Sequence, residues 1–124
     1  MRIALIAQDK KKEQMIRFCL TYAKTLSQHK LFATGTTGKM ISEHIGLPVY
    51  CFLTGRQGGE QQISERIACG EIDMLLFFRD TLTSRPRARY EDMLRFCDTH
   101  GVVYATNFYT AKALMYALEH NQID

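Results

Sequence analysis

The sequence contains no apolar run that approaches the length of a membrane span, and its first residues contain no apolar segment of signal-peptide length. Its four cysteines are isolated, without a CxxC pair or any other zinc-type spacing: Cys19, Cys51, Cys69 and Cys97. We therefore expect the cysteines to be small apolar core residues of a protein in a reducing compartment. They should form neither disulfides nor a metal site. These absences predict a cytoplasmic protein that has no membrane partner.

The chain also lacks a strong excess of either charge. Its 16 Lys and Arg residues and 13 Asp and Glu residues give a formal net charge of +3. Such mild basicity does not by itself indicate nucleic acid, and it agrees with an anionic small ligand. No repeat, low-complexity tract or linker interrupts the 124 residues, so we expect one domain covering 1–124.

Five short apolar runs alternate with helical patterns along the chain. The runs are continuous, as in strands buried on both faces of a parallel sheet, and cover residues 3–7, 31–33, 49–53, 74–78 and 102–105. The segments between them repeat apolar residues at helical spacing, as at Met15, Phe18 and Cys19. The pattern predicts an α/β fold, a three-layer, doubly wound sheet of five mainly parallel strands.

A segment rich in glycine and threonine follows the second apolar run, and a helical pattern resumes at Met40. It contains Thr34, Gly35, Thr36 and Thr37. Glycine lets the backbone approach a ligand, while threonine hydroxyls, free N–H groups and a helix N-terminus favour an anion. The GxxxxGK[ST] spacing of nucleotide-binding P-loops is absent. We interpret the segment as a loop that binds the phosphate of a small molecule, the alternative being an ordinary turn with a threonine cap.

Polar residues also follow the other strands, at the edge where ligands bind in such sheets. They include Gln8, Asp9, Lys12, Thr54, Gly55, Glu60 and Asp80. Lys12 offers a point charge for phosphate. Glu60 stands at a helix start, where the dipole favours an ionised carboxylate that can serve as a base or an acceptor, or it is an ordinary first-turn acid. Asp9 and Asp80 either orient ligand hydroxyls or cap the next helix.

Two segments together resemble the methylglyoxal synthase family: Ala-Thr-Gly-Thr-Thr-Gly at 33–38 and Gly-Gly-Glu-Gln-Gln at 58–62. The similarity continues through 3–12, 77–80 and 105–107. It implies a methylglyoxal-synthase-like fold, assembly as a hexamer, and conversion of dihydroxyacetone phosphate to methylglyoxal and phosphate without metal or cofactor. It implies phosphate binding by Lys12 and residues 34–37, ligand contacts from Thr54 and Gly55, and a base at Glu60.

Three positions depart from the family pattern. Gln8 stands where the family usually has histidine in a His-Asp pair, and Glu60 stands where it has aspartate. Arg87 occupies the place of histidine in a Pro-His motif, and the acidic residue that follows there has no counterpart. Glu60 keeps the base chemistry with one more methylene. Arg87 either neutralises an enediolate oxygen or binds phosphate, or it is a solvated charge.

The sequence therefore favours a phosphate-eliminating lyase with Glu60, Arg87 and Asp80 as catalytic groups. An intact phosphate segment beside altered catalytic positions leaves a second hypothesis, a non-catalytic or regulatory module that binds a phosphorylated metabolite on the same fold. A nucleic-acid partner that uses the basic residues of 10–12 and 85–89 has no motif to support it, and we expect none.

Overall fold

The computed structural model describes residues 1–82 and 88–123, with the backbone alone for 88–90. Within these residues five strands form one sheet in the order β3-β2-β1-β4-β5, and every neighbouring pair is parallel. The strands are β1 (Arg2–Ala7), β2 (Lys30–Ala33), β3 (Tyr50–Cys51), β4 (Met74–Phe78) and β5 (Val103–Ala105). The predicted α/β fold with a parallel sheet is confirmed.

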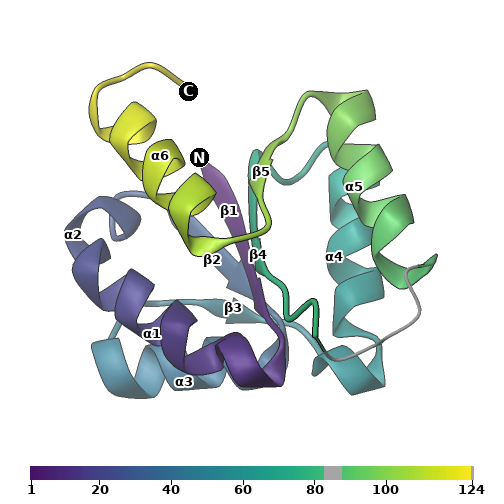
Figure 1. Ribbon diagram of the computed structural model, residues 1–124, viewed down its shortest axis with the longest axis horizontal. Coiled ribbons are helices and arrows are strands. Elements are labelled where there is room, and N and C mark those ends of the chain that lie inside the picture. Colours follow the sequence, from purple (N-terminus) through teal and green to yellow (C-terminus); the bar gives the residue numbers. More distant parts are fainter. Residues whose placement is uncertain (83–87, 124) are drawn as a thin grey trace.

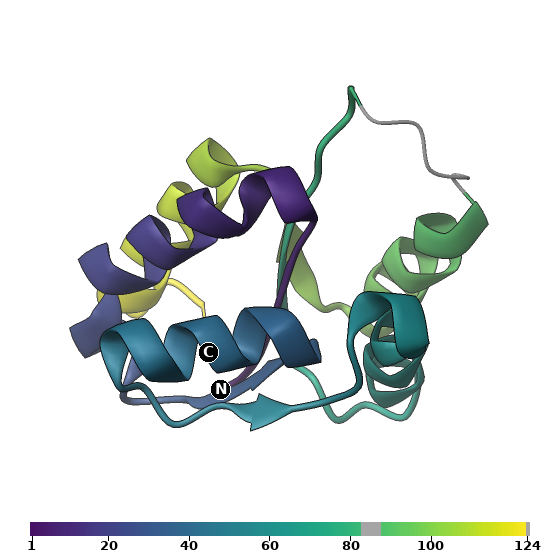
Figure 2. The same cartoon turned by 90° about the horizontal axis from the view of Figure 1, so that it is seen from below.

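Helices cover both faces of the sheet and complete three layers (Figure 1 and, from below, Figure 2). One face carries α1 (Lys12–Thr21), α2 (Ala23–Leu26), α3 (Gly35–Ile45) and α6 (Phe108–Glu119). The other carries α4 (Gly59–Ala68) and α5 (Ala88–His100). Two short 3₁₀ turns, η1 (Asp9–Lys11) and η2 (Gly55–Gln57), follow β1 and β3. In the part of the chain described, no helix is both long and apolar enough to cross a bilayer.

The alternating side chains of β1 explain why its sequence is apolar throughout. Ile3 and Leu5 belong to the core beneath α1, α3 and α6, while Ala4 and Ile6 belong to the core beneath α4 and α5. Successive residues of a strand point to opposite faces, so a strand covered on both sides has no polar alternation. The same burial applies to all five residues of β4.

The cysteines divide into two kinds. Cys19 and Cys97 are buried, and burial raises the pKa of each thiol to about 12, so both are neutral apolar filler at physiological pH. Cys51 and Cys69 are exposed, and for these two the prediction of apolar filler is wrong. All four are free thiols.

The segment predicted as a loop at 34–38 is the first turn of α3, so that prediction is wrong. Thr34 is the extended N-cap residue, and the N–H of Gly38 already donates to the Thr34 carbonyl at 2.8 Å. A Cβ on Gly35 would lie 2.9 Å from the carbonyl oxygen of Phe52. Close packing against the segment after β3 thus demands small residues here, and small residues carry no helical periodicity.

The third strand is shorter than the predicted 49–53. Leu53 donates its N–H to Oε1 of Gln62 at 2.8 Å and accepts from the N–H of Gly35 at 3.0 Å. Its backbone groups therefore bond to the starts of α4 and α3 instead of continuing the ladder. This brings the beginnings of both helices beside the end of β3.

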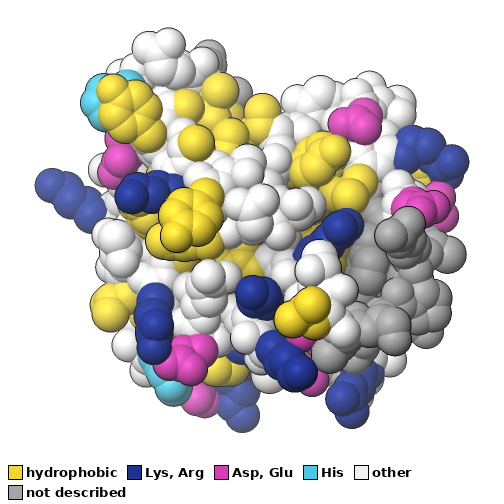
Figure 3. All heavy atoms as spheres, viewed as in Figure 1, with side chains coloured by type: hydrophobic (Ala, Val, Ile, Leu, Met, Phe, Trp, Pro, Cys, Tyr) yellow, Lys and Arg dark blue, Asp and Glu magenta, His cyan; other side chains and the backbone are white. Residues whose placement is uncertain are grey.

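Lys and Arg side chains are scattered over the face seen in Figure 3, with Asp and Glu between them. On the part of this face that the structure describes, the charges do not form one continuous basic surface. Nucleic-acid binding uses such a surface.

Candidate functional site

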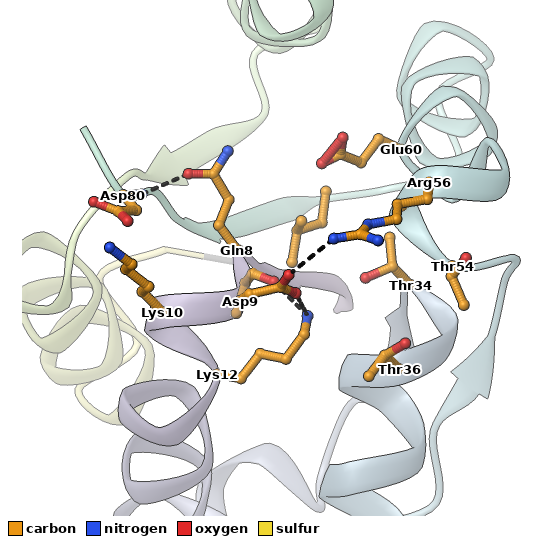
Figure 4. A pocket seen from close by; sticks show the side chains of 13 residues that line it. Gln8, Asp9, Lys10, Lys12, Thr34, Thr36, Thr54, Arg56, Glu60 and Asp80 are labelled. Atoms are coloured by element: carbon orange, nitrogen blue, oxygen red, sulfur yellow. Dashed lines mark hydrogen bonds and ion pairs between the residues drawn. The ribbon is translucent and has the colours of Figure 1, made fainter. Parts of the chain in front are cut away.

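A cavity of about 590 Å³ lies at the C-terminal edge of the sheet. Its described lining is Ile6, Ala7, Gln8, Asp9, Lys10, Lys12, Thr34, Thr36, Thr54, Gly55, Arg56, Glu60 and Asp80 (Figure 4). These residues belong to or follow β1, β2, β3 and β4. β1 and β4 are neighbours whose onward connections pass to opposite faces, so the cavity is at the topological switch point, where open α/β sheets bind ligands.

The N-terminus of α3 supplies backbone donors on one side of the cavity. Thr34 makes no side-chain capping bond, and the N–H of Gly35 is used on the carbonyl of Leu53. Among the described residues, no backbone carbonyl accepts from the N–H of Thr36 or Thr37. Together with the helix dipole, these two N–H groups are suited to an anion.

Lys12 adds a cation beside this helix start. Its Nζ donates to the carbonyl of Ala7 at 2.7 Å and to Oγ1 of Thr37 at 3.2 Å, and it lies 3.8 Å from Oδ1 of Asp9. The side chain is only 17% exposed. Lys12 thus connects the end of β1 to the first turn of α3 and places a partly desolvated positive charge next to the donors of Thr36 and Thr37.

Glu60 lies on another wall of the cavity, in the first turn of α4. The residue is 7% exposed, and its carboxylate is directed into the cavity in Figure 4. Gly58 has a φ of +108°, and a Cβ on Gly59 would overlap the carbonyl of Leu53. The two glycines therefore let α4 begin directly against the segment after β3, and this brings Glu60 to the cavity.

The ends of β1 and β4 are joined through side chains at the base of the cavity. Oε1 of Gln8 accepts the N–H of Asp80 at 2.6 Å, and Oδ1 of Asp80 accepts the N–H of Leu82 at 3.0 Å. Both residues line the cavity, and Asp80 is buried. The amide and the carboxylate are thereby set in fixed orientations beside the ligand space.

Comparison with known proteins shows the family of the chain. The family model of the MGS-like domain matches residues 14–106. The chain belongs to the MGS-like domain family. It is 49% identical over 124 residues to a protein of Caldicellulosiruptor saccharolyticus named methylglyoxal synthase, covering 99% of this chain and 88% of that protein. It is 45% identical over 125 residues to an Exiguobacterium protein of the same name, covering 100% of this chain and 91% of the relative.

A solved structure agrees with the sequence relatives. The crystal structure of methylglyoxal synthase from Elizabethkingia anophelis NUHP1 superimposes on this MGS-like domain with a TM-score of 0.84 and 35% identity. The match covers 92% of this chain and 76% of that one. At this identity the likeness extends beyond the fold class to the family.

The cavity of this MGS-like domain gathers most of the residues predicted as a site. The predicted residues that line it are Gln8, Asp9, Lys12, Thr34, Thr36, Thr54, Gly55, Glu60 and Asp80. Gly35 and Thr37 flank Thr36 on α3, one bonded to Leu53 and the other to Lys12. Arg87 lies outside the described residues. Among those described, no three His, Cys, Asp or Glu side chains are grouped as metal ligands.

Two charged residues of the cavity lining, Lys10 and Arg56, are not among the predicted site residues. Lys10 belongs to the basic run at 10–12, and such runs are usually solvated. Arg56 directly follows Thr54 and Gly55 at the end of the third apolar run. Its place at the binding edge was the available signal.

Proposed function

We propose that this MGS-like domain is a methylglyoxal synthase, a lyase that eliminates phosphate from dihydroxyacetone phosphate. Relatives that carry this name are 45–49% identical to it over nearly the whole chain. The observation that carries the proposal is that a buried carboxylate, Glu60, shares a cavity with the anion-binding start of α3. Base and phosphate site are the two parts that this elimination needs.

The phosphate end of the substrate binds at the start of α3. The N–H groups of Thr36 and Thr37, with the ammonium of Lys12, face the dianion and neutralise the charge that develops on it. The hydroxyls of Thr34 and Thr36 complete this wall, since both residues line the cavity. Thr54 and Gly55 contact the ligand from the turn that follows β3.

Glu60 acts as the general base. Its carboxylate removes a proton from the hydroxymethyl carbon next to the carbonyl, and the electron pair forms an enediolate. The C–O bond to phosphate, oriented out of the enediolate plane, then breaks, and phosphate leaves with the bonding electrons. The resulting enol tautomerises to methylglyoxal. These steps are proton transfer and elimination, so no cofactor takes part.

Asp80 and Gln8 serve the oxygen end of the substrate in this scheme. Since Gln8 fixes the backbone of Asp80, the two act as one unit at the base of the cavity. Arg87 is proposed to neutralise the enediolate oxygen or to bind phosphate. From the family resemblance we also propose a homohexamer in the cytoplasm, with residues 1–124 forming one domain.

The test is incubation of the purified protein with dihydroxyacetone phosphate, with phosphate and methylglyoxal measured separately. The proposal predicts equimolar release of both products. Thermal stabilisation by dihydroxyacetone phosphate without any release, even on long incubation, would instead identify the regulatory binding module considered from the sequence. The named relatives favour the enzyme over that module.

A further inference from the structure

Arg56 lies at the rim of the cavity on a turn whose backbone is well fixed. The N–H groups of Gln57 and Gly59 both donate to the carbonyl of Thr54, at 3.0 and 2.8 Å. Oγ1 of Thr54 donates to Oε1 of Gln57 at 3.1 Å. The Cα of Arg56 is therefore fixed relative to the cavity, while its side chain extends along the rim.

The side chain of Arg56 forms an ion pair across the mouth of the cavity. Its Nη2 lies 3.6 Å from Oδ2 of Asp9, whose Oδ1 lies 3.8 Å from Nζ of Lys12. Figure 4 shows the guanidinium and the ammonium both directed at the carboxylate of Asp9. The Arg56 and Asp9 side chains are 79% and 70% exposed, so the pair contributes little stability and rearranges at low cost.

A bound phosphate adds negative charge to the cavity, so a further cation that can move toward the ligand would stabilise it. Among the described lining residues, the cations Lys10, Lys12 and Arg56 face the carboxylates Asp9, Glu60 and Asp80. The lining is thus balanced before a phosphate monoester with up to two negative charges arrives. Lys12 already donates to the carbonyl of Ala7 and to Thr37.

The guanidinium has donors for two acceptors at once. Its five N–H groups lie in one plane and match carboxylate or phosphate oxygens in pairs. One edge can remain on Asp9 while the other binds phosphate. Because Arg56 is exposed and its ion pair with Asp9 is weak, it loses little when it turns toward a dianion.

We propose that Arg56 is a second cationic ligand of the substrate's phosphate, and that Asp9 is a positioning residue that keeps it at the rim. The inference rests on the proposed function for the identity of the substrate. The phosphate contact itself does not depend on turnover, because inorganic phosphate presents the same oxygens.

The experiment compares Arg56→Gln and Arg56→Lys in the full chain. Arg17→Gln is the matched control, since Arg17 is a similarly exposed arginine paired with Glu13 away from the cavity. Calorimetry measures the affinity for inorganic phosphate, and steady-state kinetics measure KM and kcat with dihydroxyacetone phosphate. Thermal unfolding verifies that each variant folds.

We expect Arg56→Gln to weaken phosphate binding and to raise KM by about tenfold each, as for loss of one charge-assisted contact, with a much smaller fall in kcat. The phosphate affinity and KM of Arg56→Lys are expected to lie between those of the wild type and Arg56→Gln. Arg17→Gln is expected to keep the wild-type values. Unchanged phosphate affinity in Arg56→Gln, or a wild-type chain that binds no phosphate, overturns the inference. Arg56-dependent phosphate binding without any product release supports the inference and contradicts the proposed function.

Discussion

The carboxamide oxygen of Gln8 accepts the backbone N–H of Asp80 at 2.6 Å across 72 positions of sequence. The bond joins the C-terminal ends of β1 and β4, the two neighbouring strands at the switch point (Figure 4). The family resemblance has histidine at this position. An amide is a neutral acceptor at every pH, so Gln8 orients Asp80 without a protonation change of its own.

Replacement of Gln8 by alanine should therefore disturb both stability and activity. The N–H of Asp80 loses this acceptor next to a buried side chain, which costs about 1–2 kcal/mol in the free energy of unfolding. Urea unfolding and kcat/KM measure the two effects. Gln28→Ala, at an exposed glutamine outside the cavity, should change neither. Equal behaviour of the two variants would contradict the role of Gln8.

Gln62, near the start of α4, offers a second test. Its Oε1 accepts the N–H of Leu53, and the segment from Leu53 to Gly59 carries Thr54 and Gly55. Gln62→Ala should lower the free energy of unfolding by about 1 kcal/mol and reduce turnover, because the segment loses a bond to α4. Gln61, the exposed neighbour of Gln62, provides the control. Gln61→Ala should match the wild type in both the free energy of unfolding and turnover. A loss of turnover in Gln61→Ala alone would argue against this account.

The fold could be predicted from the sequence because strands that are buried on both faces of a sheet are continuously apolar. The strand residues of β1 and β4 are continuously apolar, and their boundaries were close to those observed. The edge of the sheet that carries the cavity followed from the parallel topology. Side chains such as Gln8 and Asp80, far apart in sequence, meet because adjacent parallel strands end at the same edge.

The predictions that were wrong or incomplete concern features that depend on contacts between segments distant in sequence. The start of α3 was placed too late because Gly35 packs on the carbonyl of Phe52, and no local pattern reveals that contact. The end of β3 was placed too late because Leu53 bonds to Gln62 and Gly35. Arg56 is not among the predicted site residues because its partner, Asp9, begins η1 after another strand.

A further prediction concerns acid stability. Arg2 donates from its backbone N–H and its guanidinium to the carboxylate of Asp73 at 2.8–3.1 Å. The hydrogen bond from the Arg2 side chain lowers the pKa of Asp73 below its ordinary value. The folded state therefore binds fewer protons here than the unfolded state. The stabilisation is full above the ordinary pKa of aspartate, near 4, and is lost as pH falls through the lowered pKa.

Asp73→Asn isolates this contribution. The free energy of unfolding of the wild type should exceed that of the variant at pH 7, by a small margin because the pair is partly exposed, and the difference should vanish in acid. Asp98→Asn, at an exposed carboxylate on α5, controls for charge alone. A difference between wild type and Asp73→Asn that does not depend on pH would contradict the assignment.

Glu60 is the proposed base that starts phosphate elimination. The most direct measurement is the rate of phosphate release from dihydroxyacetone phosphate by the wild type, Glu60→Gln and Glu60→Asp, with inorganic phosphate affinity measured in parallel. We expect Glu60→Gln to lose at least about 100-fold in rate while its phosphate affinity stays nearly intact, and Glu60→Asp to keep or raise the rate. A Glu60→Gln protein that releases phosphate at the wild-type rate would contradict it.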